Sequence, residues 1–501
     1  MRAGVNLRTV AAGVVKKQGV FMGFSSKQFD FPILSTFSQA HSRGVVRWGR
    51  AGGVAKLLAV GAVISFSAVK PVTAADVVKA NNTTDLIVGS SWVGGVAPGS
   101  GDIAVWDSTV TGANTVRNTN GGTNPTFAGI RIADPGGPVT LTFRSSSVTT
   151  LGTTSSATST LIDMSAATQD LTFNAGTSGL RFAGGSNSIQ TFDVGAGRTL
   201  TINSPLFAQA NNKTLQLSGG GTISIGGAIS GSGSNPFGFR VNGPTVTLSG
   251  ANAFNLGTGS FTVAAGSLNI ANDAALGGVA SMTVSGGTIS PSGGDRSLSP
   301  NVNLTGTGRF GGSTNLTLAG AVTGAGSLFK VGAGNLSLSS AGNTYTGGTV
   351  VEAGILTTAS DFTMAGTNGF TMSGVPSPTA GSDYGAIVAS SGTLTYGGDL
   401  GLTLSGTATP GATYSLFSFS GGTQAGSFSN VVLGGSYTST LSNSGGVWTG
   451  TDAGLNFSFT ESTGQFAVTA VPEPVTFGLA GLATAALAAG WMRRRNGRHA
   501  A

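Results

Sequence analysis

The chain has 501 residues, including 84 Gly and no Cys, and only 9% of its residues are charged. Its formal net charge of +7 comes from the two ends, because residues 76–470 contain more acidic than basic residues. A nucleic-acid-binding body is therefore not expected. Both histidines, His41 and His499, also lie in the ends. The body thus lacks the residues for His- or Cys-based nucleophiles, zinc sites and haem ligation, and we expect no cofactor or metal.

Residues 1–75 are predicted to be an extended N-terminal region that ends in a secretory signal peptide. Basic residues precede the apolar run 57–69, and small residues follow it up to Asp76. This order is typical of a secretory signal, and the run is too short to span a bilayer. Cleavage is expected after Ala74 or Ala75, with the secretion translocon and signal peptidase as partners. The alternative is a buried core helix.

Residues 76–360 show short triplets in which two apolar residues flank a polar one, such as Leu141-Thr-Phe143, Leu171-Thr-Phe173 and Leu336-Ser-Leu338. In a strand this pattern points the two apolar side chains to one face and the polar one to the other. Strands this short are expected to bury their apolar face only when stacked, as in a solenoid. The pattern favours an all-β fold, a right-handed parallel β-helix with about 20–25 residues per coil.

Two segments, 247–277 and 324–356, repeat a recognisable phrase. The first consists of Thr247–Phe254 and then Phe261–Leu268, and the second of Gly324–Leu338 and then Asn343–Leu356. They resemble the autotransporter-associated β-strand repeat of bacterial surface passengers. The first copy carries an insertion after its aromatic Phe254. Residues 91–107 resemble the opening coil of such passengers, and the resemblance implies an exported surface protein.

Residues 361–470 are predicted to form a small antiparallel β-sandwich. Pro376 and Pro378 mark a break, most of the Tyr residues follow it, and the strands become longer and alternate more regularly, as in Leu400–Leu404. This sandwich is expected to close the end of the solenoid, whose last coil would otherwise expose a strand edge.

Residues 471–501 begin with Val471-Pro-Glu-Pro474 and an uncharged stretch, 475–492, that just reaches bilayer length. An Arg cluster, Arg493–Arg495, follows and is expected to stay cytoplasmic. This order resembles the PEP-CTERM sorting signal of Gram-negative bacteria. The resemblance implies that Pro472, Glu473 and Pro474 are read by an exosortase-type membrane transpeptidase. The transmembrane helix and Arg493, Arg494 and Arg495 would hold the protein in the membrane until it is cut. A permanent anchor is the alternative.

No catalytic, cofactor-binding or metal site is expected in the body. Asp163, Asp170 and Asp193 could lie on one face if the coil length suits their spacing, but they are scattered along the chain. A pair of carboxylates is the minimum for glycoside hydrolysis. Trp92 and Trp106 are expected to plug the first coil, and sugar stacking is the alternative. Asp102 and Asp107 are expected to cap turns.

Together these features predict a secreted structural or adhesive protein of the cell surface or extracellular matrix, and not an enzyme. It would be anchored transiently in the inner membrane of a Gram-negative bacterium and then moved to the outer envelope or matrix. Its many hydroxyl and amide side chains suit weak, repeated contacts with exopolysaccharide or with further copies of itself. The alternatives are a carbohydrate-active β-helix enzyme with an Asp-based site, acting as glycosidase or lyase, and a self-associating envelope coat protein.

Overall fold

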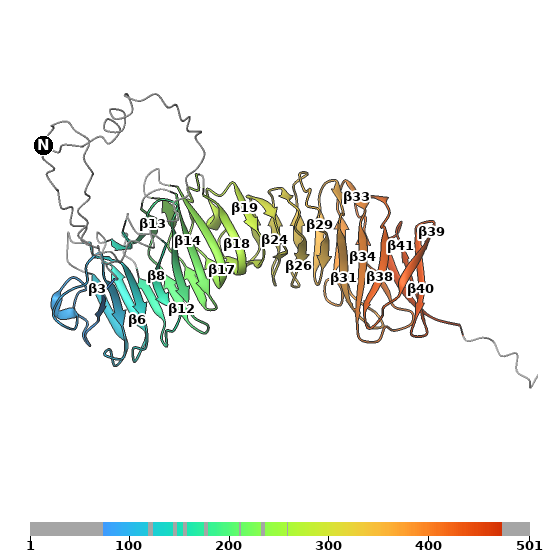
Figure 1. The fold of residues 1–501 in the computed structure, drawn as a ribbon. Coiled ribbons are helices and arrows are strands. Elements are labelled where there is room, and N and C mark those ends of the chain that lie inside the picture. The colour runs from blue at the N-terminus through green and yellow to red at the C-terminus, as the bar shows by residue number, and fades with distance from the viewer. Residues whose placement is uncertain are drawn as a thin grey trace, which may run out of the picture. The chain divides into compact units, whose positions relative to one another are not determined.

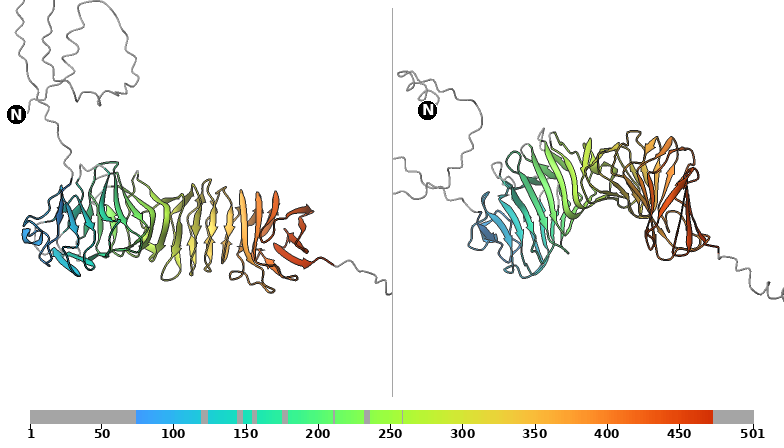
Figure 2. Two further views of the ribbon diagram at one scale, coloured as in Figure 1. Left: turned by 60° about the horizontal axis from the view of Figure 1, so that its bottom comes forward. Right: turned by 45° about the vertical axis from the view of Figure 1, so that its right-hand side comes forward.

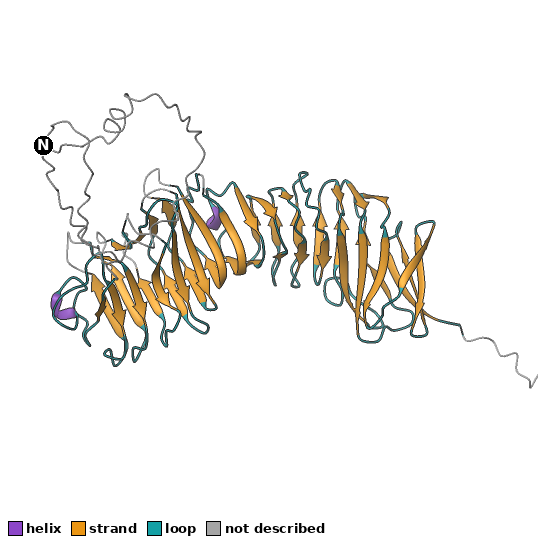
Figure 3. Cartoon of the chain, in the orientation of Figure 1, coloured by secondary structure: helices purple, strands orange, loops and turns teal. Residues whose placement is uncertain are grey.

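The computed structural model describes residues 74–118, 124–143, 148–153, 158–174, 179–209, 212–231, 236–257 and 259–472. The chain divides into two units, Met1–Lys70 and Pro71–Ala501, and all of these residues belong to the second. The described part is built almost entirely of strands, with two short 3-10 helices, η1 (Gly89–Ser91) and η2 (Asp273–Leu276) (Figures 1 and 3). The described part of the chain contains no candidate membrane-spanning helix.

The strands stack in parallel from coil to coil, and Figure 2 shows this stacking from two further directions. The first ladder contains β1 (Asp76–Val78), β2 (Ile103–Trp106), β5 (Gly129–Ile132), β8 (Ser159–Met164), β11 (Ile189–Val194), β14 (Lys213–Gly219), the first halves of β17 (Phe237–Leu248) and β18 (Phe261–Ile270), β19 (Ser281–Val284), β22 (Asn301–Leu304) and β25 (Val322–Thr323).

A second ladder runs beside the first and continues further along the chain. It contains β3 (Asn114–Asn118), β6 (Val139–Phe143), β9 (Leu171–Asn174), β12 (Thr199–Ile202), β15 (Thr222–Ile225), the second halves of β17 and β18, β20 (Thr288–Pro291), β23 (Gly308–Phe310), β26 (Leu328–Lys330), β28 (Thr349–Val351), β31 (Thr367–Ser373), β34 (Asp399–Ser405) and β38 (Asn430–Gly435).

Separate parallel sheets form the rest of the coil wall. One contains β4 (Thr126–Phe127), β7 (Thr149–Leu151), β10 (Leu180–Phe182), β13 (Leu206–Ala208) and β16 (Ile229–Gly231). Another contains β21 (Arg296–Leu298), β24 (Leu316–Leu318), β27 (Leu336–Leu338), β29 (Ile355–Thr358), β32 (Ala386–Ala389) and β36 (Phe417–Ser418). A short one contains β30 (Phe362–Thr363), β33 (Thr393–Tyr396) and β37 (Thr423–Gly426).

The predicted triplets form these strands, and their apolar pairs point inward. Leu336 and Leu338 of β27 are fully buried while Ser337 is half-buried, and the same alternation holds in β9 and β12. The buried side chains stack between coils, as where the rings of Phe239 and Phe261 lie 5.2 Å apart and nearly parallel. The parallel β-solenoid predicted from the triplets is therefore confirmed, and its right-handed sense stays a prediction.

A glycine corner separates the two halves of the long strands β17 and β18. Gly243 and Gly266 have φ values of 125° and 81°, which L side chains rarely adopt. A Cβ added to Gly266 would lie 2.4 Å from the carbonyl oxygen of Pro244 in the coil below. Only glycine fits this corner, and it lets one long strand serve both ladders.

Coil length varies more than the sequence predicted. One early coil brings Ile130 into register with Ile162 and is longer than the expected range, whereas the coil from Val284 to Leu304 lies at its lower limit. The strands of both coils, β5 to β8 and β19 to β22, are three to six residues long, so the extra residues lie in the connections between strands. Loop insertion there costs little free energy, because the entropy of loop closure grows slowly with loop length.

The predicted antiparallel sandwich over 361–470 is wrong for most of that range. Parallel pairing continues from β31 through β34 to β38, and from β32 to β36 and β33 to β37. The tyrosines that suggested a new domain are core residues of these wider coils, since Tyr384, Tyr396 and Tyr414 are at most 5% exposed. The tyrosine content rises after residue 360 because the coils there are larger, and the parallel solenoid continues.

Among the named strands of the described residues, antiparallel ladders occur only in a terminal cap and where the cap joins β38. The cap contains β35 (Thr413–Ser415), β39 (Thr440–Ser444), β40 (Val447–Asp452), β41 (Leu455–Thr460) and β42 (Gln465–Ala470). Strand β39 pairs in antiparallel fashion with β38, the last strand of the second ladder. The predicted closure of the solenoid end is thus confirmed, with a smaller element than expected.

Candidate functional site

Two columns of short polar side chains cover part of the outer wall of the second ladder. We call them the polar array. The first column is Thr199, Thr222, Thr245, Ser267 and Thr288, and the second is Thr201, Ser224, Thr247, Asn269 and Ser290. Strands β12, β15, β17, β18 and β20 carry one residue of each column, and the register across the array is unbroken (β12, β17 and β18 are labelled in Figure 1).

The array is held flat by the core beneath it. In each strand one buried apolar residue lies between the two columns, such as Leu200, Val246 and Leu268, and all three are 0% exposed. The columns are two residues apart, about 6.6 Å, and successive coils are about 4.8 Å apart. The array is therefore a regular grid of hydrogen-bonding groups on a rigid surface.

Charged pairs lie beside both ends of the first column. The backbone N–H of Thr199 donates to Asp170 Oδ1 at 2.9 Å, and Asp170 lies 3.9 Å from Arg198. At the other end Thr288 is in register with Arg309, which forms an ion pair with Glu352. Between these pairs both columns are neutral.

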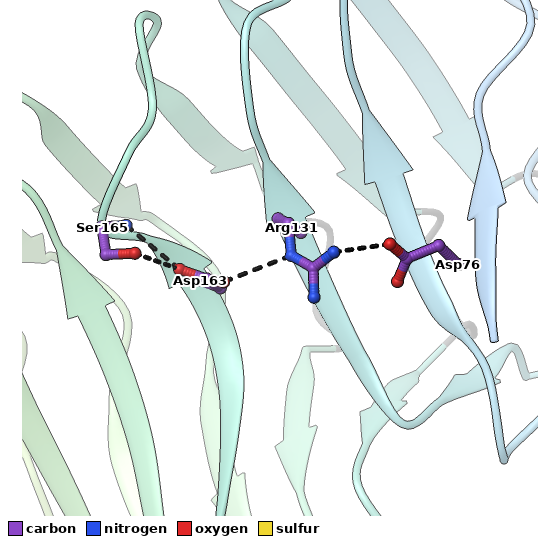
Figure 4. A network of polar contacts seen from close by, with 4 residues as sticks. All are labelled: Asp76, Arg131, Asp163 and Ser165. Atoms are coloured by element: carbon purple, nitrogen blue, oxygen red, sulfur yellow. Dashed lines mark hydrogen bonds and ion pairs between the residues drawn. The ribbon is translucent and has the colours of Figure 1, made fainter. Parts of the chain in front are cut away.

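A charged cluster occupies the outer wall of the first coils (Figure 4). The guanidinium of Arg131 on β5 binds Asp76 Oδ2 at 2.6 Å through Nη1 and Asp163 Oδ2 at 3.2 Å through Nε. Ser165 donates from its Oγ to the other oxygen of Asp163 at 2.7 Å. Arg131 therefore ties three coils together, and both oxygens of Asp163 accept hydrogen bonds.

Of the three acids considered as a possible enzyme site, Asp163, Asp170 and Asp193, the structure places only two in register. Asp163 and Asp193 are in register on β8 and β11, whereas Asp170 lies before β9 and accepts from the backbone of Thr199. A general acid must hold a proton for its leaving group, but Asp163 is occupied as an acceptor by Arg131 and Ser165. Within the described ranges, no three His, Cys, Asp or Glu side chains gather in an arrangement that could hold a metal.

The aromatic and acidic residues of the first coil have structural positions. Trp92 and Trp106 are at most 2% exposed, and their rings pack edge to face at 5.7 Å. They plug the coil as predicted, so the alternative of sugar stacking is wrong. Asp102 accepts from Gly99 N at 2.8 Å and Asp107 from Thr109 N at 2.9 Å, which confirms both as turn caps.

The predicted processing residues lie at the edges of the described chain. Ala74 and Ala75 are exposed just before β1, and the carbonyl of Ala75 accepts from Ile103 N at 2.8 Å. Pro472 is exposed shortly after β42. Glu473, Pro474, Arg493, Arg494 and Arg495 lie outside the described residues, as do the apolar run of the signal peptide and the predicted helix over 475–492.

Sequence reasoning pointed to polar outward residues in general but missed the polar array. A signal for it was present, because the phrase Thr–apolar–Thr or Ser–apolar recurs at Thr199–Ile202, Thr222–Ile225 and Thr245–Leu248. The array can be recognised only when it is known which residues of neighbouring coils lie side by side. The connections between the strands differ in length, so the sequence alone does not give this register.

Three lysines are buried in the coil wall. The Nζ atoms of Lys79 and Lys330 each donate to three oxygen atoms of nearby turns, and the Nζ of Lys213 lies 5.8 Å from the ring centroid of Phe182. Burial lowers the pKa of each lysine from 10.5 to about 8. The oxygen acceptors around Lys79 and Lys330 are neutral, so they offset the lost hydration only in part.

These lysines predict an unusual pH dependence. Between about pH 8 and pH 10 the unfolded chain keeps these protons while the folded chain releases them, so the free energy of unfolding should rise with pH. Above about pH 10 the trend should reverse, since burial raises the pKa of Tyr345 and Tyr396 and unfolding lets them ionise. Melting temperatures measured across this range check both signs. Lys330→Met should show a smaller rise, and a steady fall from pH 8 in the wild type would contradict the prediction.

These observations define a class: a parallel β-solenoid with a polar wall and an antiparallel cap. Residues 328–357 match the family model of the passenger-associated-transport-repeat. This segment contains β26, β27, β28 and most of β29, and it confirms the resemblance of the second repeat copy. The match indicates a secreted, surface-exposed protein that carries a passenger-type repeat. No curated protein and no solved structure matches the chain.

Proposed function

We propose that the protein is a structural or adhesive rod of the cell surface or extracellular matrix, placed there by an exosortase-type transpeptidase. The observation that carries this proposal is a passenger-type repeat in a solenoid whose wall presents ladders of neutral polar side chains. Many weak contacts along such a wall add up through multivalency. Polysaccharide, or a second copy of the chain, is the partner that this surface suits.

The protein acts in this proposal by binding and not by catalysis. The side chains of the polar array are hydroxyls and one amide, which can donate and accept hydrogen bonds but include no activating base. Asp163 and Asp193 are in register, but Asp163 is paired with Arg131. The test incubates the protein with soluble polysaccharides and measures the release of reducing ends. Release by the wild type that is lost in Asp163→Asn would overturn this part of the proposal.

The sorting part of the proposal predicts a mature protein without either end. Cleavage after Ala74 preserves the Ala75 carbonyl that accepts from Ile103, so we expect Ala75 as the first residue, with Asp76 as the alternative. At the other end the chain should end near Pro472–Pro474, because the signal begins directly after the cap. Intact-mass measurement of the envelope or secreted form checks both ends. A species that retains Arg493–Arg495 would show a permanent anchor.

Cell fractionation tests the location independently of binding. We expect the protein in the outer envelope or matrix, and Pro472→Ala with Pro474→Ala should leave it in the inner membrane. The matched control is Pro376→Ala with Pro378→Ala, which changes two prolines in a loop of the last coils. Unchanged sorting of the signal variant would overturn the exosortase assignment.

A further inference from the structure

We propose that the polar array binds one extended chain of a neutral, equatorially linked polysaccharide, laid parallel to the stacking axis of the coils. This inference rests on the proposed function and assigns it a site and a ligand class. Each coil would face about one sugar ring, because the coil spacing of about 4.8 Å is close to the length that a ring adds to such a chain. The array spans five coils, which is about 19 Å.

Most hydroxyls of the array are available to a ligand. Thr247 accepts from Asn269 Nδ2 at 3.5 Å, and Ser290 Oγ donates to the Gly311 carbonyl at 2.8 Å. The other seven hydroxyls make no hydrogen bond within the described part of the chain: Thr199, Thr201, Thr222, Ser224, Thr245, Ser267 and Thr288. Each can donate one hydrogen bond and accept two, which suits a ligand whose own polar groups are hydroxyls.

The array is already ordered, so binding would cost it little conformational entropy. Thr, Ser and Asn side chains are short, and the buried residues beneath them fix the backbone. A single hydrogen bond that replaces a bond to water contributes little. A ligand with the same repeat as the grid makes several such contacts at once, and the later ones are intramolecular.

Charge favours a neutral polymer over an anionic one. The array itself carries no charge, and the guanidinium groups beside the two ends of its first column, Arg198 and Arg309, are engaged by Asp170 and Glu352. Residues 76–470 as a whole carry more acids than bases. A polyuronate would therefore meet net repulsion from the acidic body and no free cation in the two columns of the array.

The experiment measures retention of the purified mature protein on microcrystalline cellulose, with alginate beads as the anionic comparison. The array variant combines Thr199→Val, Thr222→Val and Thr245→Val, which remove three hydroxyls and keep the side-chain shape and strand preference. The control combines Thr317→Val and Thr357→Val on β24 and β29. These hydroxyls lie outside the array, in a single column on another sheet, so they do not form a grid. A single Thr222→Glu, at an exposed position, is the second array variant.

We expect the wild type and the control to bind cellulose alike, the Val variant to bind about tenfold more weakly, and Thr222→Glu to bind more weakly than wild type. All four should melt at similar temperatures. No retention on cellulose, stronger retention on alginate, or an array variant that binds like wild type would overturn the inference. A change in sedimentation of the array variants would assign the array to a second copy and also overturn it. Correct surface location and processing in the same preparation would leave the proposed function standing.

Discussion

Replacing Leu336 or Leu338 by Asp is expected to lower the free energy of unfolding by several kcal/mol. Both side chains are fully buried on β27, where they stack on Leu316 and Leu318 of the preceding coil. An aspartate there would place an unpaired carboxylate inside the stack, and burying such a charge without a partner is very costly. Urea denaturation followed by circular dichroism measures the loss.

Ser337→Asp is the matched control for this pair. Ser337 lies between the two leucines but points outward, so its substitution should change the free energy of unfolding by no more than about 0.5 kcal/mol. The contrast tests the alternation of the strand, since a slip of one residue would exchange the two faces. Equal melting of all three variants would show that residues 336–338 do not form an inward-outward strand.

The second large effect is expected at Glu461, which joins the cap to the last coil. Its side chain is 5% exposed, and Oε1 accepts from Trp448 Nε1 at 2.9 Å, Ser427 Oγ at 2.8 Å and Phe428 N at 3.1 Å. Glu461→Ala would leave the indole N–H of Trp448 and the backbone N–H of Phe428, both on buried residues, without this acceptor. We expect a loss of about 2–4 kcal/mol, which hydrogen–deuterium exchange should locate mainly in β39–β42.

Glu352→Ala provides the comparison for Glu461→Ala. Glu352 also accepts from a donor side chain, but its ion pair with Arg309 is about one-third exposed on both sides. Such pairs contribute about 0–1 kcal/mol. If the two alanine variants lose the same free energy of unfolding, Glu461 does not hold the cap in the way described.

The sequence predicted the solenoid because its triplets report a local property, the side to which each residue points. Leu171-Thr-Phe173 and Leu200-Thr-Ile202 could be assigned inward and outward faces without knowing their partners. The strands after residue 360 were misassigned because parallel and antiparallel strands can share the same alternation. What distinguishes them is the partner strand, and β31 meets β34 only after the chain has completed a long coil.

The candidate site was less predictable for the same reason. The polar array depends on the register of five strands whose connections differ in length. The Arg131 cluster joins Asp76 on β1 to Asp163 on β8, across four successive coils of the first ladder. Turn caps such as Asp107 were predictable, since the carboxylate binds a backbone N–H two residues away. Local contacts could be inferred from the sequence, and contacts between coils could not.

The buried lysines have a consequence for the chemistry of the exposed surface. Residues 76–470 contain three lysines, and all three are the fully buried Lys79, Lys213 and Lys330. The basic side chains on the outside, such as Arg117 and Arg131, are arginines. A folded body processed at Ala74 or Ala75 would therefore offer amine-reactive aldehydes and Lys-directed proteases almost no accessible side-chain amine. Its new α-amino group would be the main target for amine chemistry, which provides a single labelling position at one end of the coil stack.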